Sequence, residues 1–381
     1  MTKRVSVLGA TGSIGSSTTD LLHRHKDQFQ TVVLTGGNNV HDLIQKSLLL
    51  KPELAVIKNP DLYQGLKDGL AGTGIKTAAG DAAILEAASM PADTVLSAIL
   101  GTAGLLPTLT ALKQGTCVAL ANKESLVAAG FLMMEAVKKY GATLLPVDSE
   151  HSAIFQAFET HNRSAVEKII LTASGGAFLN KKPNELSEIT PEQATKHPNW
   201  DMGAKITVDC ATLVNKGLEL IETHYFFDFP ESQIDVIIHP QSIIHSMVAY
   251  HDGSVLAQLG TPDMRTPIAY SLAWPNRITT PVKKLSLAEL GSLTFLPVDL
   301  NRFPALKLAR QALQDGKGLV FNAANEIAVE AFLKGRISFL KIVDVIEEML
   351  ERTSFTKPTS IEEVLAQDQV VRQLTEGVLE R

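Results

Sequence analysis

The chain opens its first apolar run with Arg4-Val5-Ser6-Val7-Leu8 and continues directly into Gly9-Ala10-Thr11-Gly12-Ser13-Ile14-Gly15. The run has the composition of a β-strand, and the pattern from Thr18 to His25 predicts a helix after the glycines. A tight glycine-rich turn between a strand and a helix lets backbone N–H groups reach a pyrophosphate. The spacing is G-x-x-G-x-x-G, and an ordinary glycine turn is the alternative. In this context the stretch predicts nucleotide binding.

Short β-rich runs alternate with helical patterns over the first ~150 residues, which is typical of a parallel sheet with crossover helices. Several runs are apolar almost throughout, as in strands covered on both faces. We expect further strands at Thr31–Thr35, Leu54–Lys58, Thr94–Ile99, Thr116–Ala121 and Ala142–Val147. The pattern predicts an α/β fold with an N-terminal Rossmann-like, NADP-binding domain over residues 1–147.

The remaining chain shows a different pattern of predicted secondary structure. Residues 148–280 suggest a central α+β domain, with a helix at 152–160, a strand at 168–172 and a hairpin around His251-Asp252-Gly253. Residues 281–304 resemble an extended linker. A C-terminal helical bundle is expected over 305–381, with one helix opened by Ser338 and another by a capping box at Thr359-Ser360-Ile361-Glu362.

The bulk composition limits the functional classes. The 381 residues are 45% apolar and 20% charged, which is typical of a soluble globular protein of two or three domains. A net charge of -6 without a basic run argues against nucleic-acid binding. No apolar stretch reaches the ~18 residues of a membrane span. Met1-Thr2-Lys3-Arg4 leads into a strand and not into a signal peptide, and Cys117 and Cys210 suggest reduced thiols, so we expect a cytoplasmic protein.

Two segments bear on the cofactor. The second strand ends in Thr35-Gly36-Gly37-Asn38-Asn39, without the carboxylate that binds the ribose of NAD, so NADP is favoured, although no Arg or Lys is present there either. Ala121-Asn122-Lys123-Glu124-Ser125 follows another strand, at the sheet edge where ligands bind. Lys123 could therefore approach cofactor and substrate. A helix start with a surface Lys–Glu pair is the alternative.

Carboxylates suggest a metal site. Asp148 and Glu150 are two residues apart after an apolar run, so their side chains converge if that run is a strand. Asn215 and Glu219 are four apart in the helical run 211–223 and share a face. Three carboxylates suit Mg²⁺ or Mn²⁺. The alternatives are an acid/base pair, a helix cap before 152–160 and, for Glu219, a solvated helix face with Glu222 as a decoy.

An anion site and a lid are also suggested. Ser174-Gly175-Gly176 follows a strand and could bind a phosphate together with Asn215 and Lys216, although a structural glycine turn explains the glycines equally well. His197-Pro198-Asn199-Trp200-Asp201-Met202-Gly203 lies in a polar, proline-rich stretch and suits a lid, whereas a loop Trp is more often a packing anchor. His239 and His245 are candidates for the site or for structural roles.

Seven motifs taken together resemble one family, 1-deoxy-D-xylulose 5-phosphate reductoisomerase. They occur in that family's order over essentially the whole chain: GATGSIG, ALANKESLV, PVDSEHSAIFQ, LTASGGAF, HPNWDMG, NKGLELIE and HPQSIIHSMV. The resemblance implies a homodimer that uses NADPH and one divalent metal (Mg²⁺, Mn²⁺ or Co²⁺), and it implies that the 148–280 domain serves catalysis and dimerisation. It also implies rearrangement and reduction of a sugar phosphate, 1-deoxy-D-xylulose 5-phosphate, to 2-C-methyl-D-erythritol 4-phosphate.

The resemblance also assigns residue roles. Metal ligands and catalytic residues are implied at Asp148, Glu150 and Glu219, with Lys123 also catalytic. Substrate contacts are implied at Ser149, Glu150, Ser174, His197, Trp200, Cys210, Asn215, Lys216 and Glu219. The lid corresponds to His197, Pro198, Asn199, Trp200 and Met202, near residues 195–204. Cofactor contacts are implied at Thr11, Gly12, Ser13, Ile14, Gly37, Asn38, Asn39, Asn122, Lys123, Glu124, Gly203 and Met264.

Two positions depart from that family's pattern. Cys210 stands where many members have a phosphate-binding Ser, and a thiol is a weaker donor. Asn38 stands where a basic residue often helps to select NADPH.

Two rival functions remain at this point: an ordinary NADP dehydrogenase, whose activity survives EDTA, and a non-catalytic NADP-binding protein, which shows no turnover.

Overall fold

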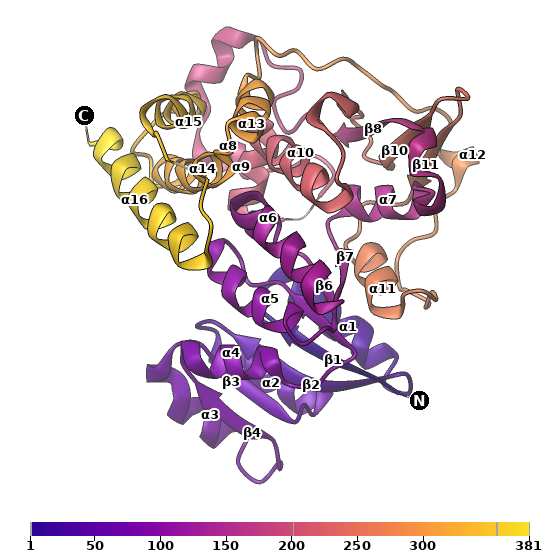
Figure 1. Cartoon of the computed structure of the whole chain (residues 1–381), viewed down its shortest axis with the longest axis vertical. Coiled ribbons are helices and arrows are strands. Elements are labelled where there is room, and N and C mark those ends of the chain that lie inside the picture. The colour runs from indigo at the N-terminus through magenta and orange to yellow at the C-terminus, as the bar shows by residue number, and fades with distance from the viewer. Residues whose placement is uncertain (1, 201, 356, 381) are drawn as a thin grey trace. The chain divides into compact units, whose positions relative to one another are not determined.

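The computed structural model describes residues 2–200, 202–355 and 357–380. By their contacts the residues form two compact units (Figure 1). The first unit comprises the chain up to Ser125 together with Met133–Ser152 and Met264–Val282, and the second comprises Leu126–Leu132, Ala153–Asp263 and the chain from Lys283 onward. No helix in the described part of the chain is long and apolar enough to cross a membrane.

The first unit is built on one parallel sheet, as the sequence predicts. Its strand order is β4-β3-β2-β1-β5-β6-β7. The strands are β1 (Lys3–Leu8), β2 (Phe29–Gly36), β3 (Leu54–Ile57), β4 (Lys76–Ala79), β5 (Thr94–Ser97), β6 (Cys117–Leu120) and β7 (Thr143–Pro146). Strand β4 was not expected, because Lys-Thr-Ala-Ala is short and lacks the apolar signal of the other strands.

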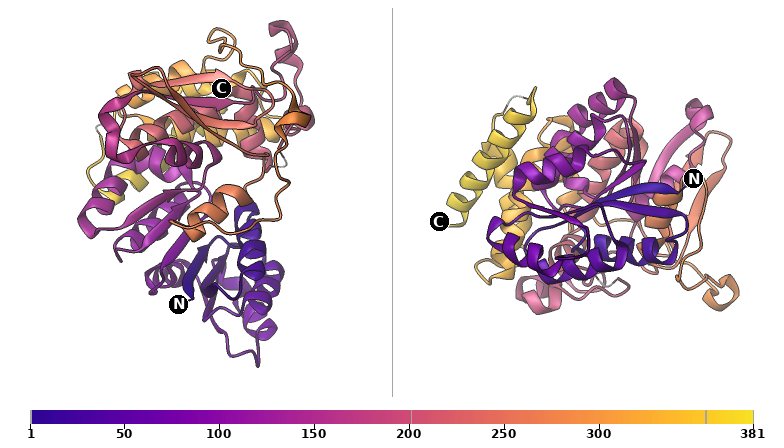
Figure 2. Two further views of the ribbon diagram at one scale, coloured as in Figure 1. Left: turned by 90° about the vertical axis from the view of Figure 1, so that its right-hand side faces the viewer. Right: turned by 90° about the horizontal axis from the view of Figure 1, so that it is seen from below.

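Helices cover both faces of this sheet (Figure 2). The helices of this unit are α1 (Ser13–Arg24), α2 (Val40–Leu50), α3 (Tyr63–Gly69), α4 (Asp81–Ser89), α5 (Leu105–Leu112) and α11 (Arg265–Ala273), together with parts of α6 (Lys123–Tyr140) and the start of α7 (Ser149–Ala157). Helix α1 begins at Ser13, earlier than the expected Thr18, because the last residues of the glycine-rich stretch already form its first turn.

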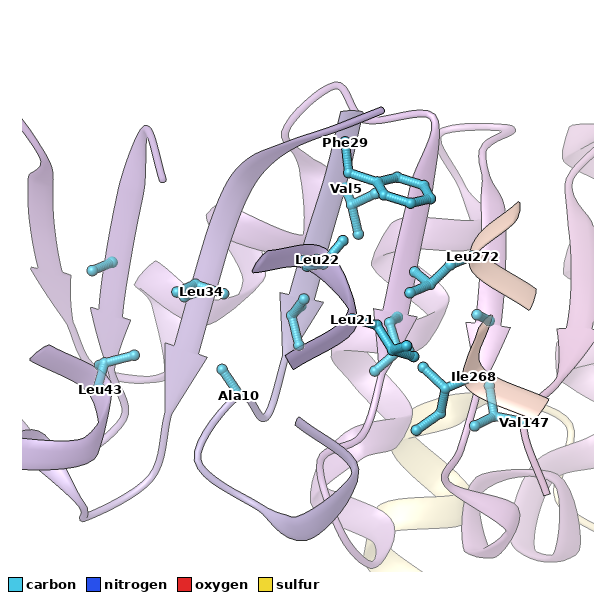
Figure 3. Close-up of a cluster of buried hydrophobic side chains, with 14 of the residues drawn as sticks. Val5, Ala10, Leu21, Leu22, Phe29, Leu34, Leu43, Val147, Ile268 and Leu272 are labelled. Carbon is cyan, nitrogen blue, oxygen red and sulfur yellow. The ribbon is translucent and has the colours of Figure 1, made fainter. Parts of the chain in front are cut away.

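The core of this unit includes a helix from far along the chain. Ile268 and Leu272, four residues apart on α11, pack with Leu21 and Leu22 of α1 (Figure 3). Burying these side chains removes apolar surface from water and holds α11 on the sheet face that carries α1. Met264–Val282 therefore lies with the N-terminal unit, although the sequence-based boundaries assign it to the 148–280 domain.

The second unit contains a four-stranded mixed sheet. Its order is β11-β10-β8-β9, with β10 antiparallel to β11 and β8 and with β8 parallel to β9. The strands are β8 (Val166–Ala173), β9 (Ile234–Ile238), β10 (Ile244–Tyr250) and β11 (Val255–Leu259). The predicted hairpin around His251-Asp252-Gly253 is therefore confirmed.

The helical run expected over 211–223 is in fact two helices. Helix α9 (Ala204–Thr212) ends and α10 (Val214–Phe227) begins at Leu213, whose φ of +61° breaks the helix. A left-handed backbone angle at a leucine has no sequence signature, because such angles are usual only for glycine and asparagine. The prediction of a continuous helix was wrong at this point.

The C-terminal part is helical, as predicted. It contains α13 (Ala305–Gln314), α14 (Gly318–Leu333), α15 (Lys341–Arg352) and α16 (Ile361–Leu379). Helix α15 begins after Ser338, so this serine does not open it. The capping box before α16 is shifted by one residue: Ser360 Oγ accepts from Glu363 N at 3.2 Å, and Glu363 Oε2 accepts from Thr359 N at 2.6 Å.

The expected linker at 281–304 is largely irregular. It contains the short α12 (Leu287–Leu290) and an isolated bridge between Leu296 and Ile238. Other short elements are α8 (Pro191–Ala194) and the 3₁₀ turns η1 (Pro60–Leu62), η2 (Thr102–Gly104), η3 (Thr160–Ala165), η4 (Pro183–Glu188) and η5 (Glu231–Gln233).

Candidate functional site

The glycine-rich turn leaves the first amides of α1 without a side-chain cap. Gly12 is the N-cap residue, and no side chain bonds to the helix start there. Gly12 and Ser13 are exposed, while Thr11 and Ile14 are half-buried. Gly9 has a φ of +91°, and a Cβ there would lie 2.6 Å from the Ala98 carbonyl oxygen. The geometry requires glycine and leaves unpaired helix N–H groups where an anion can bind.

The end of β2 offers amides and no unpaired acid. Asn38 and Asn39 are exposed, and Asn39 Oδ1 caps α2 by accepting from Asp42 N at 3.1 Å. The Asp42 carboxylate in turn accepts from Lys46 at 2.6 Å. The one acid among residues 35–42 is thus paired with a lysine, so this segment itself carries no free negative charge that would repel a 2′-phosphate.

Lys123 and Asp148 form an ion pair within the first unit, in which 9% of the Lys123 side chain and 11% of the Asp148 side chain are exposed. Asn122 caps α6 by accepting from Ser125 N at 3.1 Å, which sets Lys123 at the first position of the helix. Lys123 and Glu124 are both buried, so the alternative of a surface Lys–Glu pair is wrong. Burial alone raises the pKa of the Asp148 carboxyl, but the charges of Lys123 and His151 outweigh it and hold that pKa well below the usual 3.8.

Asp148 and Glu150 lie near each other, although not for the reason expected. Strand β7 ends at Pro146 and α7 begins at Ser149, so Glu150 lies in the first turn of a helix. The alternation argument from a strand is therefore wrong. Each of the two side chains nevertheless offers a carboxylate oxygen within 4.8 Å of the other's. Ser149 Oγ donates to Glu150 Oε2 at 2.6 Å.

In the second unit, one face of α10 gathers the residues expected there. Asn215 Nδ2 donates to Glu219 Oε1 at 2.5 Å, and Lys216 forms an ion pair with the other oxygen. The shared face predicted from the four-residue spacing is confirmed. Only 1% of the Glu219 side chain is exposed, so the alternative of a solvated helix face is wrong. Glu222 is equally buried, which means that burial alone does not separate it from Glu219.

The turn after β8 is tightly packed against α9. Gly175 and Gly176 have φ angles of +85° and +69°, and a Cβ on Gly176 would lie 2.6 Å from the Cys210 carbonyl oxygen. Gly176 N donates to Ser174 Oγ at 3.1 Å. The structure thus brings Ser174 and the backbone of Cys210 to the same turn.

His197 connects this turn to the expected lid. Its Nδ1 accepts from the backbone N–H groups of Asn199 and Trp200, both at 3.1 Å, so the ring proton lies on Nε2. Nε2 donates to Ser174 Oγ at 2.9 Å. Burial lowers the pKa of His197 to about 4, so the ring is neutral at physiological pH. Ser174 Oγ thus accepts two hydrogen bonds and keeps its own proton for a ligand.

The segment expected to form the lid is anchored on the loop between β9 and β10. Asn199 Nδ2 donates to the Pro240 carbonyl at 2.5 Å and to Ser242 Oγ at 3.2 Å, and the Trp200 and His245 ring centroids lie 6.0 Å apart. Met202 and Gly203 follow, with Gly203 as the N-cap of α9, and Asp201 lies outside the described residues.

Three candidate residues remain to be placed. His239 bonds to the Thr294 carbonyl at 2.8 Å and accepts from Ile243 N at 3.1 Å, which supports its structural interpretation. Met264 packs against the core of the first unit, and Pro198 lies in the lid segment.

Two basic residues beside the candidate sites were missed by the sequence analysis. Lys46 of α2 donates to the Ala10 carbonyl in the glycine-rich turn at 2.8 Å. Arg302 donates to the carbonyls of Phe178 and Leu179, the latter at 2.8 Å, just beyond the Ser174 turn. Neither contact has a local motif, because these carbonyl groups lie far from Lys46 and Arg302 in the sequence.

Comparison with known proteins identifies relatives over the whole length. Family models match residues 5–130 (1-deoxy-D-xylulose 5-phosphate reductoisomerase), 144–227 (the C-terminal domain of that enzyme) and 259–374 (DXP reductoisomerase C-terminal domain). The 1-deoxy-D-xylulose 5-phosphate reductoisomerase of Zymomonas mobilis is 51% identical over 380 residues, covering 99% of this chain and 98% of that relative. That of Rhodospirillum centenum is 52% identical over 373 residues, covering 97% and 93%.

Solved structures agree with this. The Zymomonas mobilis enzyme in complex with NADPH superposes with a TM-score of 0.95 at 49% identity, covering 100% of both chains. A DOX-P reductoisomerase in complex with NADPH, fosmidomycin and magnesium gives a TM-score of 0.94 at 42% identity, covering 99% of this chain and 98% of the other.

Proposed function

The chain belongs to the 1-deoxy-D-xylulose 5-phosphate reductoisomerase family, and on this premise we propose the full reaction of the protein and the residues that carry it. It is an NADP-dependent reductoisomerase. The proposed reaction is the NADPH- and divalent-metal-dependent rearrangement and reduction of 1-deoxy-D-xylulose 5-phosphate to 2-C-methyl-D-erythritol 4-phosphate. Magnesium in a family structure supports the metal requirement.

NADPH binds, in this proposal, along the carboxyl edge of the first unit's sheet. The uncapped start of α1 receives the pyrophosphate, because free helix N–H groups and the helix dipole favour an anion. The exposed amides after β2 receive the adenosine end. Bound NADPH supplies the hydride, and the protein supplies its orientation. The proposed cofactor contacts are Thr11, Gly12, Ser13, Ile14, Gly37, Asn38, Asn39, Asn122, Lys123, Glu124, Gly203 and Met264.

The proposed metal ligands are Asp148, Glu150 and Glu219. The chemistry of the donors fits a hard cation, because carboxylate oxygens are the ligands that Mg²⁺ and Mn²⁺ prefer. Asp148 and Glu150 are two acids held close together, an arrangement that costs free energy unless a cation or proton lies between them. A divalent cation there supplies Lewis-acid polarisation of the substrate's carbonyl and hydroxyl oxygens.

The protein's own groups bind and enclose the substrate. Ser174 offers its hydroxyl proton to a phosphate oxygen, because its two accepting positions are already used. Asn215 and Lys216 offer further donors from α10, and Cys210 lies beside the same turn. The lid carrying Trp200 excludes water from the reacting centre. The remaining proposed substrate contacts are Ser149, Glu150, His197 and Glu219, and Lys123 holds Asp148 ionised.

The observation that carries the metal proposal is the approach of Asp148 and Glu150, whose carboxylate oxygens lie within 4.8 Å of each other. The test is NADPH oxidation with 1-deoxy-D-xylulose 5-phosphate, measured after EDTA treatment and after addition of Mg²⁺, Mn²⁺ or Co²⁺. Activity that disappears with EDTA and returns with the metal is expected. Activity that survives EDTA would indicate an ordinary dehydrogenase, and dinucleotide binding without turnover would indicate a sensor.

We also propose a homodimer in the cytoplasm. Strand β11 forms one edge of its sheet, and Val255, Leu256 and Leu259 on it are exposed. An apolar edge strand is a site for pairing with another chain. The cysteines, both among the described residues, form no disulfide, which fits a reducing compartment. The variant Leu256→Glu should be monomeric by light scattering, whereas a wild-type chain that is itself monomeric would refute the dimer.

A further inference from the structure

Lys46 of α2 is a buried lysine at the back of the glycine-rich turn. Its Nζ donates to the Ala10 carbonyl at 2.8 Å, to Ser16 Oγ at 2.7 Å and to Asp42 Oδ2 at 2.6 Å. An ammonium group has three N–H donors, and all three are therefore used. The three acceptors belong to the turn, to α1 and to α2.

The contacts reach further into the turn. Ser16 Oγ itself donates to the Gly12 carbonyl at 2.9 Å, so Lys46 is connected to Gly12 through the serine. On the other side, Thr35 at the end of β2 accepts from Gly9 N at 2.9 Å and from Ala10 N at 2.7 Å. Both polar groups of the Ala10 backbone are therefore held, one by β2 and the other by Lys46.

A simple helix salt bridge does not explain this arrangement. The pair with Asp42 has the i,i+4 spacing of ion pairs that contribute little to stability on a helix surface. It accounts for one of the three contacts, and it does not require the ammonium to be buried. Burying a charge is costly unless it is fully hydrogen-bonded, and here the turn provides the other two acceptors.

We propose that Lys46 is a positioning residue for dinucleotide binding. It holds the backbone of the Gly9–Gly15 turn in the conformation that presents the first N–H groups of α1 to the pyrophosphate. Its own donors are occupied, so it does not bind the phosphate itself. This inference rests on the proposed NADPH-dependent function. Because NADPH and NADH share the pyrophosphate, Lys46 supports the binding of both equally.

The test is the variant Lys46→Met, which removes the ammonium but keeps an unbranched side chain. Kd for NADPH and for NADH is measured by fluorescence titration, and steady-state kinetics gives kcat and KM. Losing the charged hydrogen bonds to the turn should raise both Kd values about tenfold. The value of kcat at saturating NADPH, and KM for the sugar phosphate, should change less than about twofold. Lys67→Met, on exposed α3, is the matched control and should bind as wild type.

Two further variants separate the possible causes. Asp42→Asn keeps the contacts of Lys46 to Ala10 and Ser16, so dinucleotide affinity should stay within about twofold of wild type. Ser16→Ala removes the connection to Gly12, so it should weaken both dinucleotides about threefold. This variant also provides the test if Lys46→Met does not fold.

Several results would overturn the inference. One is an unchanged Kd in Lys46→Met or in Ser16→Ala. Another is a loss of affinity confined to NADPH, which would indicate a charge effect on the 2′-phosphate. The third is a loss of dinucleotide affinity in Asp42→Asn equal to that in Lys46→Met. If the wild-type protein binds NADPH and the variants bind it equally well, the inference about Lys46 fails while the proposed function stands. A wild-type chain that binds neither dinucleotide overturns the proposed function and the inference together.

Discussion

The substitution Gly176→Ala tests the packing of the candidate phosphate-binding turn. Gly176 has a φ of +69°, where a residue with a Cβ loses about 1–2 kcal/mol. The added Cβ would also lie 2.6 Å from the Cys210 carbonyl oxygen and 2.7 Å from the Ala211 Cα, both backbone atoms of α9. Relieving such a contact by shifting the backbone costs about 1–3 kcal/mol more. We therefore expect a loss of about 2–5 kcal/mol in the free energy of unfolding.

The turn and α9 must move apart to accept the methyl group. The Ser174 hydroxyl and Cys210 of α9 would then no longer be placed to contact the same phosphate. Urea denaturation followed by circular dichroism measures the stability, and steady-state kinetics should show KM for the sugar phosphate raised at least about tenfold with KM for NADPH unchanged. Gly377→Ala is the control, because a Cβ there meets nothing within 4 Å and alanine favours the helix by up to ~1 kcal/mol. A Gly176→Ala protein within about 0.5 kcal/mol of wild type would refute the steric argument.

Four further outcomes are expected. Asp148→Asn should abolish turnover while NADPH affinity by fluorescence titration stays near wild type, because the carboxylate is needed for the metal; full activity would contradict the metal role. An NMR titration of His197 should have its midpoint at about 4, because burial lowers its pKa. Since that folded-state pKa lies below the usual 6.5, the free energy of unfolding should decrease as pH falls from about 6.5 towards 4, and a midpoint near 6.5 would argue against burial of the ring. Cys210→Ser should bind substrate at least as tightly, since a hydroxyl is the stronger donor, and a clear rise in KM would count against this contact. Arg302→Leu should lower the free energy of unfolding by about 1–3 kcal/mol in urea denaturation, because the Leu179 carbonyl loses its donor, and an unchanged stability would show that the carbonyl finds another partner.

Local patterns in the sequence predicted much of the architecture. The strand–turn–helix at Gly9–Gly15 and the hairpin at His251–Gly253 depend on residues adjacent in the chain, and both are present. The shared face of Asn215 and Glu219 follows from helical periodicity alone, and the two side chains are hydrogen-bonded. The roles of these residues in binding and catalysis stay predictions, because sequence spacing and burial do not show what a side chain binds.

Other features depend on residues that are distant in sequence. The placement of α11 with the N-terminal unit comes from packing of Ile268 and Leu272 on α1, and no property of residues 264–282 alone predicts this. The break at Leu213 is likewise imposed by surrounding structure, since leucine itself disfavours a positive φ. The expected strand geometry of Asp148 and Glu150 failed because the chain leaves the sheet at Pro146 and begins α7 immediately.

By itself, therefore, the sequence determined the α/β class, the position of the glycine-rich turn and the family, because these depend on short contiguous motifs. Only the tertiary structure decided that Lys123 pairs with Asp148, that His197 carries its proton on Nε2, and that Lys46 donates to the glycine-rich turn. The physical reason is the same in each case. Burial makes a polar group depend on its partners in space, and those partners come from elements that sequence order does not bring together.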